Sequence, residues 1–457
     1  MALLTEAQAR AIAEKVLKLS KAETCSLAVG SSEESNVRTA RGAVSTAGTT
    51  RNTTLGVTVT FGKRSGTSST NDFDDASLER CVRKAEELAR LAPEDPEYMP
   101  PIGPQEYQRT PAWSDRTAAF SADDRARFAK DAVDACKAAD CVGAGFYVQE
   151  QGSVAVANSN GLFGFHRQTR ATFTITSRTR DELGSGFATQ DAIDVAGLDA
   201  QAAARIASEK AKASREAKAI EPGKYTVVME PAALVDLLQP MVGGMDARTA
   251  DEGRSFLSKR GGGTRLGEKL VDERITIVSD PMDPVAAAGP WAGGGGGGGF
   301  FGGGGSDGRA RGRTVFIENG VVKNLAYSRY WAQKQGVAGV PGPANMIFNG
   351  GTASLEDLIR GTQRGILVTR TWYIRPVDPR TLLYTGLTRD GTFYIEDGQI
   401  KHAVKNLRFN ESPVIMLNNL DEMGKPVRVR NTETFLPAVV PPMRIRDFTF
   451  SSLSDAV

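Results

Sequence analysis

The stretch from Tyr225 to Gly263 joins the two halves of the chain, and it limits the possible folds more than any other part of the sequence. Tyr225–Met229 is a short, apolar and β-branched run, which predicts a strand. Pro231 suits the first turn of a helix because its missing N–H has no partner there. The residues that form an apolar stripe after it are Ala232, Ala233, Leu234, Leu237 and Leu238. Pro240 and the pair Gly243-Gly244 predict the end of this helix.

The composition is that of an ordinary globular protein. Hydrophobic residues make up 40% and charged residues 24% of the chain, as is typical of soluble globular proteins. Its length of 457 residues exceeds a single typical core, so we expect two or three domains. The 56 basic and 54 acidic side chains give a formal net charge of +2. Because no large basic field follows from this balance, we expect no nucleic-acid partner.

The sequence also gives expectations about the compartment. It contains no run of about 18 apolar residues, so we expect no membrane span. The first residues predict a helix and no signal peptide, because Glu6 and Glu14 interrupt any apolar core. The four cysteines include no C-x-x-C pair, which argues against a cysteine zinc site and a disulfide framework. We therefore expect a cytoplasmic protein.

The first part of the chain predicts a mixture of helices and strands. Thr5 can cap the first helix. Strands are expected at Cys25–Val29 and at Leu55–Phe61, where apolar and small or polar residues alternate. Asp74 or Asp75 can cap the next helix. The residues expected on its buried stripe are Leu78, Cys81, Val82, Ala85 and Leu88.

A proline-rich segment, residues 91–104, predicts an extended arm. It is followed by a predicted helix around Arg125–Lys137, by strands, and by a second helix over about Asp199–Lys218. We place one α/β domain with its proline-rich arm at residues 1–110 and a middle α/β region at residues 111–222.

The second half is rich in strand and turn signals. Thr314–Lys323 (TVFIENGVVK) and Thr392–Lys401 (TFYIEDGQIK) each place Asn-Gly or Asp-Gly between alternating runs, which predicts a two-residue type I′ hairpin. We expect both hairpins in one curved or barrel-like sheet of a β-rich domain at residues 223–457. The predicted fold class is α+β, with a mixed helix and sheet N-terminal half and a β-rich, barrel-like C-terminal domain.

A glycine-rich tract lies between Trp291 and Gly308. It contains G-x-G-x-x-G, and Gly304–Gly308 fits the G-x-S-x-G pattern of a serine nucleophile. Neither match has its required context. A phosphate-binding G-x-G-x-x-G loop needs a strand before it and a helix after it. A G-x-S-x-G serine needs a strand-to-helix turn with a histidine in reach. We expect a mobile surface loop, with a lid over a cleft as the alternative.

With its flanks, the stretch from Tyr225 to Gly263 resembles the TldD/PmbA proteins, which are cytoplasmic chains described as metallopeptidases and as modulators of DNA gyrase. The segments DARTADEGRSFLSK, SDPMDP, LAYSRYWAQKQG and most of the sequence after Arg370 resemble the same family. Together they cover most of Tyr225–Val457, in the family's order and spacing. GVTVTFGKRSGTSSTNDFDD in the first half resembles the family more loosely.

The resemblance implies the fold, and it also implies where a catalytic metal would bind. In metal-bearing members the helix after the strand looks like HExxxH, and a cysteine near the C-terminus looks like a third ligand. Here that helix reads ALVDLLQP, and the C-terminal segment RVRNTETFLPAVVPP contains no cysteine. Because these donors are missing, we expect neither a metal nor another cofactor.

Other catalytic arrangements find little support in the sequence. His166 and His402 are the two histidines of the chain. We interpret His166 as solvated or hydrogen-bonded and His402 as a surface residue, which leaves a serine or cysteine mechanism without a base. Carboxylate pairs such as Asp251-Glu252, or Asp378 with Glu396, remain a candidate acid–base pair. The alternative is that they are structural acids, paired with arginines nearby in sequence.

TldD/PmbA proteins are described as pairs in which one subunit carries the metal helix and the other lacks it, and in which an extended peptide adds as a strand to a sheet edge. The resemblance therefore implies the non-metal subunit, with a metal-bearing TldD-like paralogue as partner, or a homodimer. The candidate peptide-binding residues are Arg248, Asp251, Glu252, Arg254, Ser255, Arg329, Arg375, Asp378 and Thr388. They can equally be buried ion pairs that stabilise the fold. The alternatives are a stand-alone peptide- or protein-binding homodimer without hydrolysis, and a peptidase that uses carboxylates or an unrecognised metal site.

Overall fold

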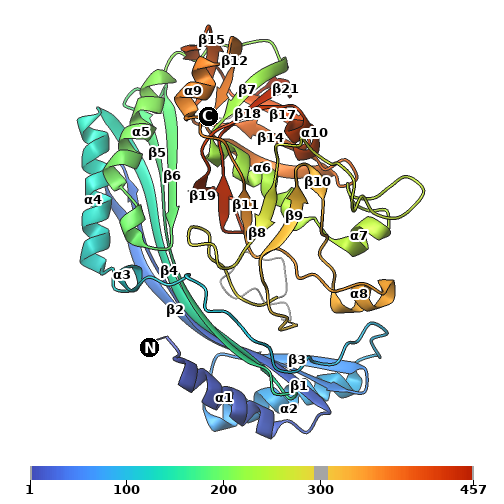
Figure 1. Ribbon diagram of the computed structural model, residues 1–457. Coiled ribbons are helices and arrows are strands. Elements are labelled where there is room, and N and C mark those ends of the chain that lie inside the picture. The colour runs from blue at the N-terminus through green and yellow to red at the C-terminus, as the bar shows by residue number, and fades with distance from the viewer. Residues whose placement is uncertain (1–2, 293–306, 455–457) are drawn as a thin grey trace.

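The structure, a computed structural model, describes residues 3–292 and 307–454. Its N-terminal half is built on one six-stranded antiparallel sheet with the strand order β3-β2-β1-β4-β5-β6. The strands are β1 (Thr24–Ala40), β2 (Ala43–Phe61), β3 (Arg64–Thr70), β4 (Cys141–Asn158), β5 (Phe163–Thr179) and β6 (Ser185–Ala192). Figure 1 shows that this sheet is long and curved, with its concave side toward the C-terminal half.

Helices cover the outer side of this sheet at its two ends (Figure 1). They are α1 (Glu6–Leu19), α2 (Asp75–Leu91), α3 (Asp115–Ala118), α4 (Ala122–Ala138), the 3-10 turn η1 (Val195–Gly197) and α5 (Ala200–Ala213). α1 and α2 share one apolar core with β1 and β2, while α4 and α5 share another with β4 and β5. Gly186 lets α5 approach β6 closely, because a Cβ at this position would meet the carbonyl oxygen of Ala207 at 2.2 Å.

The sequence placed the helix caps correctly but made two strands too short. Thr5 and Asp74 cap α1 and α2 as predicted. β1 and β2 continue far beyond Cys25–Val29 and Leu55–Phe61. The sequence did not reveal this because residues 43–52 of β2 are all exposed and, apart from Val44, polar or small. The alternation of buried and exposed residues detects only strands with one buried face. Leu88 was also assigned wrongly to the buried stripe, since it is 38% exposed.

The C-terminal half contains two sheets. One is a nine-stranded sheet with the order β13-β14-β17-β21-β7-β12-β15-β16, in which β18 also pairs with β21. This sheet curls into a half-barrel. The other is a six-stranded sheet with the order β10-β9-β8-β11-β20-β19. The strands are β7 (Gly223–Met229), β8 (Ile277–Ser279), β9 (Thr314–Glu318), β10 (Val321–Val322), β11 (Met346–Phe348), β12 (Arg364–Val368), β13 (Thr371–Asp378), β14 (Leu383–Thr388), β15 (Thr392–Glu396), β16 (Gln399–Ala403), β17 (Leu407–Glu411), β18 (Leu420–Met423), β19 (Val427–Val429), β20 (Ala438–Val440) and β21 (Met443–Leu453). The helices are α6 (Pro231–Gly243), α7 (Ala247–Asp251), α8 (Arg329–Gln335), α9 (Leu355–Arg360) and α10 (Pro413–Asn418). The apolar side chains of α6 share one core with residues of both sheets.

Both predicted hairpins form with the predicted turn. Asn319 and Gly320 have φ values of 49° and 77°, and Asp397 and Gly398 have φ values of 51° and 71°, as a type I′ turn requires. The expectation that the two hairpins share one sheet is wrong. β9 and β10 belong to the six-stranded sheet, whereas β15 and β16 belong to the half-barrel. Turn chemistry fixes each hairpin locally, but it does not choose the sheet that the hairpin joins.

The predicted fold class is confirmed, with a mixed helix and sheet N-terminal half and a β-rich, curled C-terminal half. Strands from both N-terminal segments, 1–110 and 111–222, join in the same sheet, and the domain boundaries stay a prediction. The proline-rich segment 91–104 has almost no regular structure beyond the end of α2, as expected of an arm. The glycine-rich tract between Trp291 and Gly308 lies largely outside the described residues. Among the helices that are described, none has the length and apolar character needed to cross a membrane.

Partly buried polar contacts join the two halves. Ser185 Oγ of β6 donates a hydrogen bond of 2.5 Å to the carboxylate of Asp390, and Thr189 Oγ1 donates one of 2.7 Å to the carbonyl of Arg430. Asp191 of β6 pairs with Arg428 of β19 at 2.6 Å. β6, at one edge of the N-terminal sheet, is therefore held against the strands and loops that follow α6 in the C-terminal half.

Candidate functional site

The strand–helix unit at the start of the C-terminal half places α6 in the protein interior. β7 pairs with β12 on one side and β21 on the other, so the helix that follows begins at the middle of the half-barrel sheet. Pro231 occupies the first turn of α6, as predicted. Leu234, Leu237 and Leu238 are fully buried. A polar side chain on this helix therefore needs a partner within the protein.

Two such side chains, Asp236 and Gln239, lie three residues apart on α6 and are 3% and 2% exposed. Their partners belong to the segment 431–435, between β19 and β20. Thr434 Oγ1 donates a 2.6 Å hydrogen bond to Asp236 Oδ1, and the backbone N–H of Glu433 donates one of 3.3 Å to Oδ2. Gln239 Nε2 donates to the carbonyl of Glu433 at 2.7 Å, and Gln239 Oε1 accepts from the N–H of Phe435 at 2.8 Å.

Asn431 fixes the same segment to the start of α6. Its Nδ2 donates to the carbonyls of Ala232 at 3.1 Å and Thr371 at 3.4 Å, and its backbone N–H donates to Thr434 Oγ1 at 2.9 Å. The side chains of Asp236, Gln239, Asn431 and Thr434, with the backbone they bind, form a connected unit that we call the α6 network. All four side chains are at most 3% exposed.

Burial sets the electrostatics of this network. Removal from water raises the pKa of Asp236 to about 6, while the hydrogen bonds from Thr434 and from the backbone of Glu433 oppose the shift. A buried carboxylate favours its protonated form unless donors or cations compensate. Asp236 therefore titrates nearer to neutral pH than an ordinary aspartate does.

The residues at this place do not fit a catalytic metal. A zinc site needs three histidine, cysteine or carboxylate ligands with one open position. α6 offers the single carboxylate of Asp236, whose oxygens already accept hydrogen bonds from the protein. Within residues 3–292 and 307–454, no group of three or more His, Cys, Asp and Glu side chains is placed to hold a metal ion.

The two histidines lie elsewhere. His166 of β5 is 8% exposed, lies 3.4 Å from Gln168 Oε1, and has its pKa lowered by burial to about 4. It is hydrogen-bonded as predicted but is not solvated. His402 of β16 is half-buried, stacks on Tyr394 with ring centroids 5.2 Å apart, and contacts the carbonyl of Ala403 at 2.9 Å. Neither imidazole contacts the α6 network.

Several predicted peptide-binding residues gather around α7, where they bind one another. Arg248 makes a bidentate ion pair with Glu97 of the extended arm, at 2.7 and 2.8 Å, and also pairs with Glu252 at 2.9 Å. Glu252 also pairs with Arg254, and Asp251 accepts a 2.7 Å hydrogen bond from the indole of Trp331. These contacts attach the arm and α8 to α7, which is the structural alternative raised by the sequence. The buried Ser255 accepts from the N–H of Leu257 at 3.2 Å.

The remaining predicted residues are dispersed. Arg375 of β13 pairs with Glu433 at 2.8 Å, beside the α6 network. Asp378 accepts from the N–H of Arg380 at 3.0 Å, within a turn. Thr388 is fully buried and accepts from the N–H of Leu407 at 3.0 Å. Arg329, at the start of α8, is half-buried. Their role in peptide binding stays a prediction.

The candidate carboxylate pairs also do not assemble into an acid–base site. Glu252 is engaged by two arginines. Asp378 and Glu396 lie on β13 and β15, which are separated in the half-barrel sheet by β14, β17, β21, β7 and β12. The hypothesis that these two acids act together is therefore wrong.

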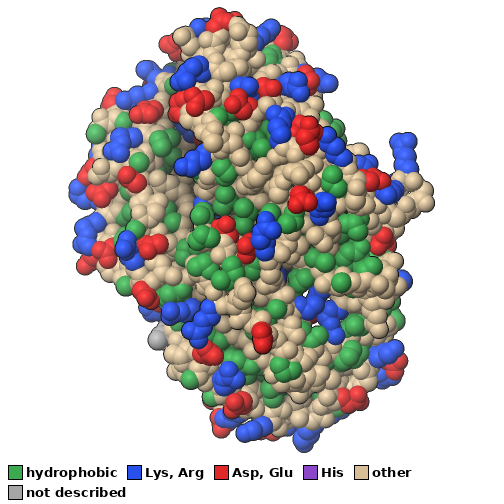
Figure 2. Space-filling view, viewed as in Figure 1, with side chains coloured by type: hydrophobic (Ala, Val, Ile, Leu, Met, Phe, Trp, Pro, Cys, Tyr) green, Lys and Arg blue, Asp and Glu red, His purple; other side chains and the backbone are tan. Residues whose placement is uncertain are grey.

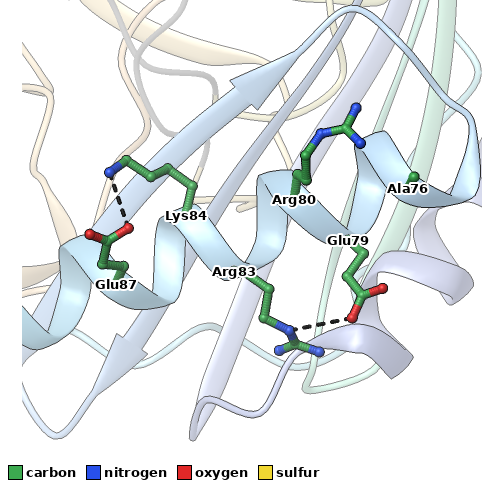
Figure 3. A pocket seen from close by; sticks show the side chains of 6 residues that line it. All are labelled: Ala76, Glu79, Arg80, Arg83, Lys84 and Glu87. Carbon is green, nitrogen blue, oxygen red and sulfur yellow. Dashed lines mark hydrogen bonds and ion pairs between the residues drawn. The ribbon is translucent and has the colours of Figure 1, made fainter.

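A pocket on the outer face of α2 is a separate feature. The residues that line it are Ala76, Glu79, Arg80, Arg83, Lys84 and Glu87. Figure 3 shows that they all come from one helix and that Arg83 pairs with Glu79 and Lys84 with Glu87, at 3.7 and 3.1 Å. Such pairs are typical of a solvated helix surface. On the face shown in Figure 2, basic and acidic side chains are likewise interspersed, and neither sign forms a large field.

Sequence reasoning missed the α6 network. The available signal was the pair Asp236 and Gln239 at a spacing of three on a helix that is otherwise apolar, because two polar residues on a buried helix need partners. The positions of Asn431 and Thr434 gave no comparable signal, since they lie in an irregular segment far along the chain.

Comparisons with known proteins agree over nearly the whole chain. Residues 25–89 match domain 1, residues 115–215 match the central domain, and residues 222–452 match the C-terminal domain of the PmbA/TldA metallopeptidases. A metalloprotease of Methanothermobacter thermautotrophicus is 24% identical over 62% of this chain and 62% of its own length. An uncharacterized protein of Methanocaldococcus jannaschii is 28% identical over 41% of this chain and 40% of its own. The matches thus span less than two thirds of these relatives.

Solved structures share the fold at low sequence identity. A proposed modulator of a DNA gyrase from Thermotoga maritima has a TM-score of 0.83 at 19% identity, covering 97% of this chain and 100% of that one. TldE from Thermococcus kodakarensis has a TM-score of 0.81 at 19% identity, covering 97% and 99%. The three matched domains and the shared fold together show that this chain is a member of the TldD/PmbA family.

Proposed function

We propose that this protein is the non-metal subunit of a TldD/TldE-type metallopeptidase, and that it binds extended peptides for cleavage by a metal-bearing partner. The α6 network is the observation that carries this proposal. Where the family resemblance places an HExxxH helix and a C-terminal cysteine, this chain has Asp236 and Gln239 hydrogen-bonded to Thr434 and to the backbone around it. These groups hold a helix and a loop together and leave no set of donors for an ion.

The edge of the N-terminal sheet supports the peptide- and partner-binding part of the proposal. β3 pairs with β2 only over Leu55–Phe61. Residues 43–52 of β2 pair with β1 on one side, and their other edge has no ladder partner among the described strands. A long, unpaired strand edge can accept an extended segment of another chain through main-chain hydrogen bonds.

Elemental analysis and a cleavage assay test the proposal. The purified chain is expected to contain no stoichiometric transition metal and to cleave no unstructured peptide by itself. Mixed with a TldD-like paralogue that carries HExxxH, it is expected to form a stable complex and to raise peptide cleavage above that of the paralogue alone. A tightly bound transition metal in the isolated chain, or cleavage by the chain alone, would overturn the assignment.

The size of the purified protein distinguishes the remaining alternative. A stand-alone homodimer that binds peptides without hydrolysis would show a stable dimer by light scattering and no complex with the paralogue. Within residues 43–52 the N–H of Ala47 points to the unpaired edge, because Phe61 of the same parity faces β3 and no bulge interrupts β2 between them. Ala47→Pro removes this main-chain donor. If this edge is the interface, Ala47→Pro weakens complex formation, whereas Thr67→Pro on β3 serves as the control substitution at another strand.

A further inference from the structure

Three arginines gather around one carboxylate between the extended arm and α8. Arg309 pairs with Asp307 at 2.8 Å and donates to the carbonyl of Tyr327 at 3.0 Å. Arg311 and Arg329 also interact electrostatically with both Asp307 and Arg309. We call Asp307, Arg309, Arg311 and Arg329 the arginine cluster. One negative charge faces three positive ones.

The guanidinium groups of Arg311 and Arg329 have no ion pair and no hydrogen bond to any residue that the structure describes, and the Nε of Arg311 is buried without a partner. Burial lowers the pKa of Arg311 to about 10; the negative charge of Asp307 opposes this shift, and the positive charge of Arg309 adds to it. Burial also lowers the pKa of Arg329. The adjacent tract 293–306 contains only Gly, Phe and Ser, so its side chains bring no carboxylate.

The backbone that carries these arginines is fixed on both sides. Tyr107, which follows the arm, donates a 2.5 Å hydrogen bond to the carbonyl of Gly308. The N–H of Arg311 donates to the carbonyl of Pro290 at 2.8 Å, and Trp291 bridges to Ala310. Two partly desolvated cations are thus held in place, and the carboxylate near them, Asp307, already pairs with Arg309.

We propose that the arginine cluster binds a carboxylate of the peptide ligand through Arg311 and Arg329. Guanidinium groups bind carboxylates through paired, charge-assisted hydrogen bonds. Arg311 and Arg329 are half-buried residues and are not fully enclosed by the protein. This inference rests on the proposed peptide-binding function and deepens it by assigning a charge preference, either for a C-terminal carboxylate or for an acidic side chain.

Fluorescence anisotropy with labelled peptides tests this inference. The probes are three unstructured 12-residue peptides of Ala, Ser, Thr and Val: one with a free C-terminal carboxylate, one with a C-terminal amide, and one amidated with a single central Asp. Each is titrated with the chain alone and with the chain saturated with an HExxxH paralogue. At least one acidic peptide is expected to bind about 10-fold more tightly than the neutral amide, and which one does so identifies the source of the carboxylate.

Variants of Arg311 and Arg329 test whether these two residues cause the preference for acidic peptides. Arg311→Gln and Arg329→Gln are each expected to remove most of the 10-fold difference in affinity between the preferred acidic peptide and the neutral amide. Arg313→Gln is the matched control, because Arg313 lies in the same segment but is exposed. Melting temperatures of both variants at or above that of the parent chain show that lost binding is not lost folding. If one variant fails to fold, the other decides.

The outcomes separate this inference from the proposed function. Equal affinities for acidic and neutral peptides, or a preference that survives in both variants, overturn the inference and leave peptide binding intact. If none of the three peptides binds in either form of the protein, the peptide-binding part of the proposed function fails, and the inference fails with it.

Discussion

The α6 network and the arginine cluster are both polar sites in the C-terminal half, but they differ in how far their charged groups are satisfied. In the α6 network, Asp236 and Gln239 find hydrogen-bond partners within a neighbouring loop. In the arginine cluster, Arg311 and Arg329 have none among the described residues, although burial lowers the pKa of both. Satisfied polar groups stabilise a fold, whereas desolvated charges without partners cost stability and point to a ligand.

Gln239→Leu gives the largest expected loss of stability. It removes the hydrogen-bond partners of the Glu433 carbonyl and the Phe435 N–H. Each buried group left without a partner costs about 1–3 kcal/mol. We therefore expect the unfolding free energy to fall by about 3–4 kcal/mol. Urea unfolding measures it. Gln201→Leu, at an exposed position of α5, is the control, and an equal loss in both variants would show that the network does not matter.

Asp236 makes the stability of the network depend on pH. Its pKa is about 6 in the folded protein, against 3.8 for an unperturbed aspartate. Between these values the unfolded chain has released the proton that the folded chain retains, so stability falls as pH rises from about 4 to about 6, by up to about 3 kcal/mol. In Asp236→Asn this contribution is absent. Urea unfolding at pH 5 and pH 7.5 is therefore expected to show that the variant loses less unfolding free energy with rising pH than the parent does. Equal pH dependence of the two proteins would contradict the raised pKa of Asp236.

Thr434→Val tests the single hydroxyl that connects two members of the network. The substitution keeps the shape of the side chain but removes the donor to Asp236 and the acceptor for the Asn431 N–H. We expect a loss of about 1–2 kcal/mol and a further rise in the pKa of Asp236, followed by its carboxyl signal in NMR. Thr352→Val, at an exposed position before α9, should change stability by less than about 0.5 kcal/mol.

Arg311→Gln is expected to have the smallest effect, and one of opposite sign. Replacing a desolvated cation that lacks a partner by a neutral side chain should leave the unfolding free energy unchanged or raise it by less than about 1 kcal/mol. Thermal unfolding beside Arg313→Gln measures the difference. A clear loss of stability in Arg311→Gln alone would make Arg311 a structural residue and remove the contrast with the α6 network.

Features set by neighbouring residues could be predicted from the sequence. Pro231 and the apolar run after it gave the strand–helix unit that becomes β7 and α6. The Asn-Gly and Asp-Gly pairs gave two type I′ hairpins, because those residues tolerate the positive φ that the turn needs. The identity of the residues on α6 and near the C-terminus was enough to show that the usual metal donors are missing.

Only the tertiary structure decided which distant segments meet. It brought the loop at 431–435 to Asp236 and Gln239, and it placed Arg309 against Tyr327, close in sequence to Arg329. It also assigned the two hairpins to different sheets and paired the polar part of β2, where no apolar alternation marks a strand. The physical reason is that backbone preference and ligand chemistry belong to individual residues, whereas burial and hydrogen-bond partners depend on segments that are far apart in sequence and adjacent only after packing.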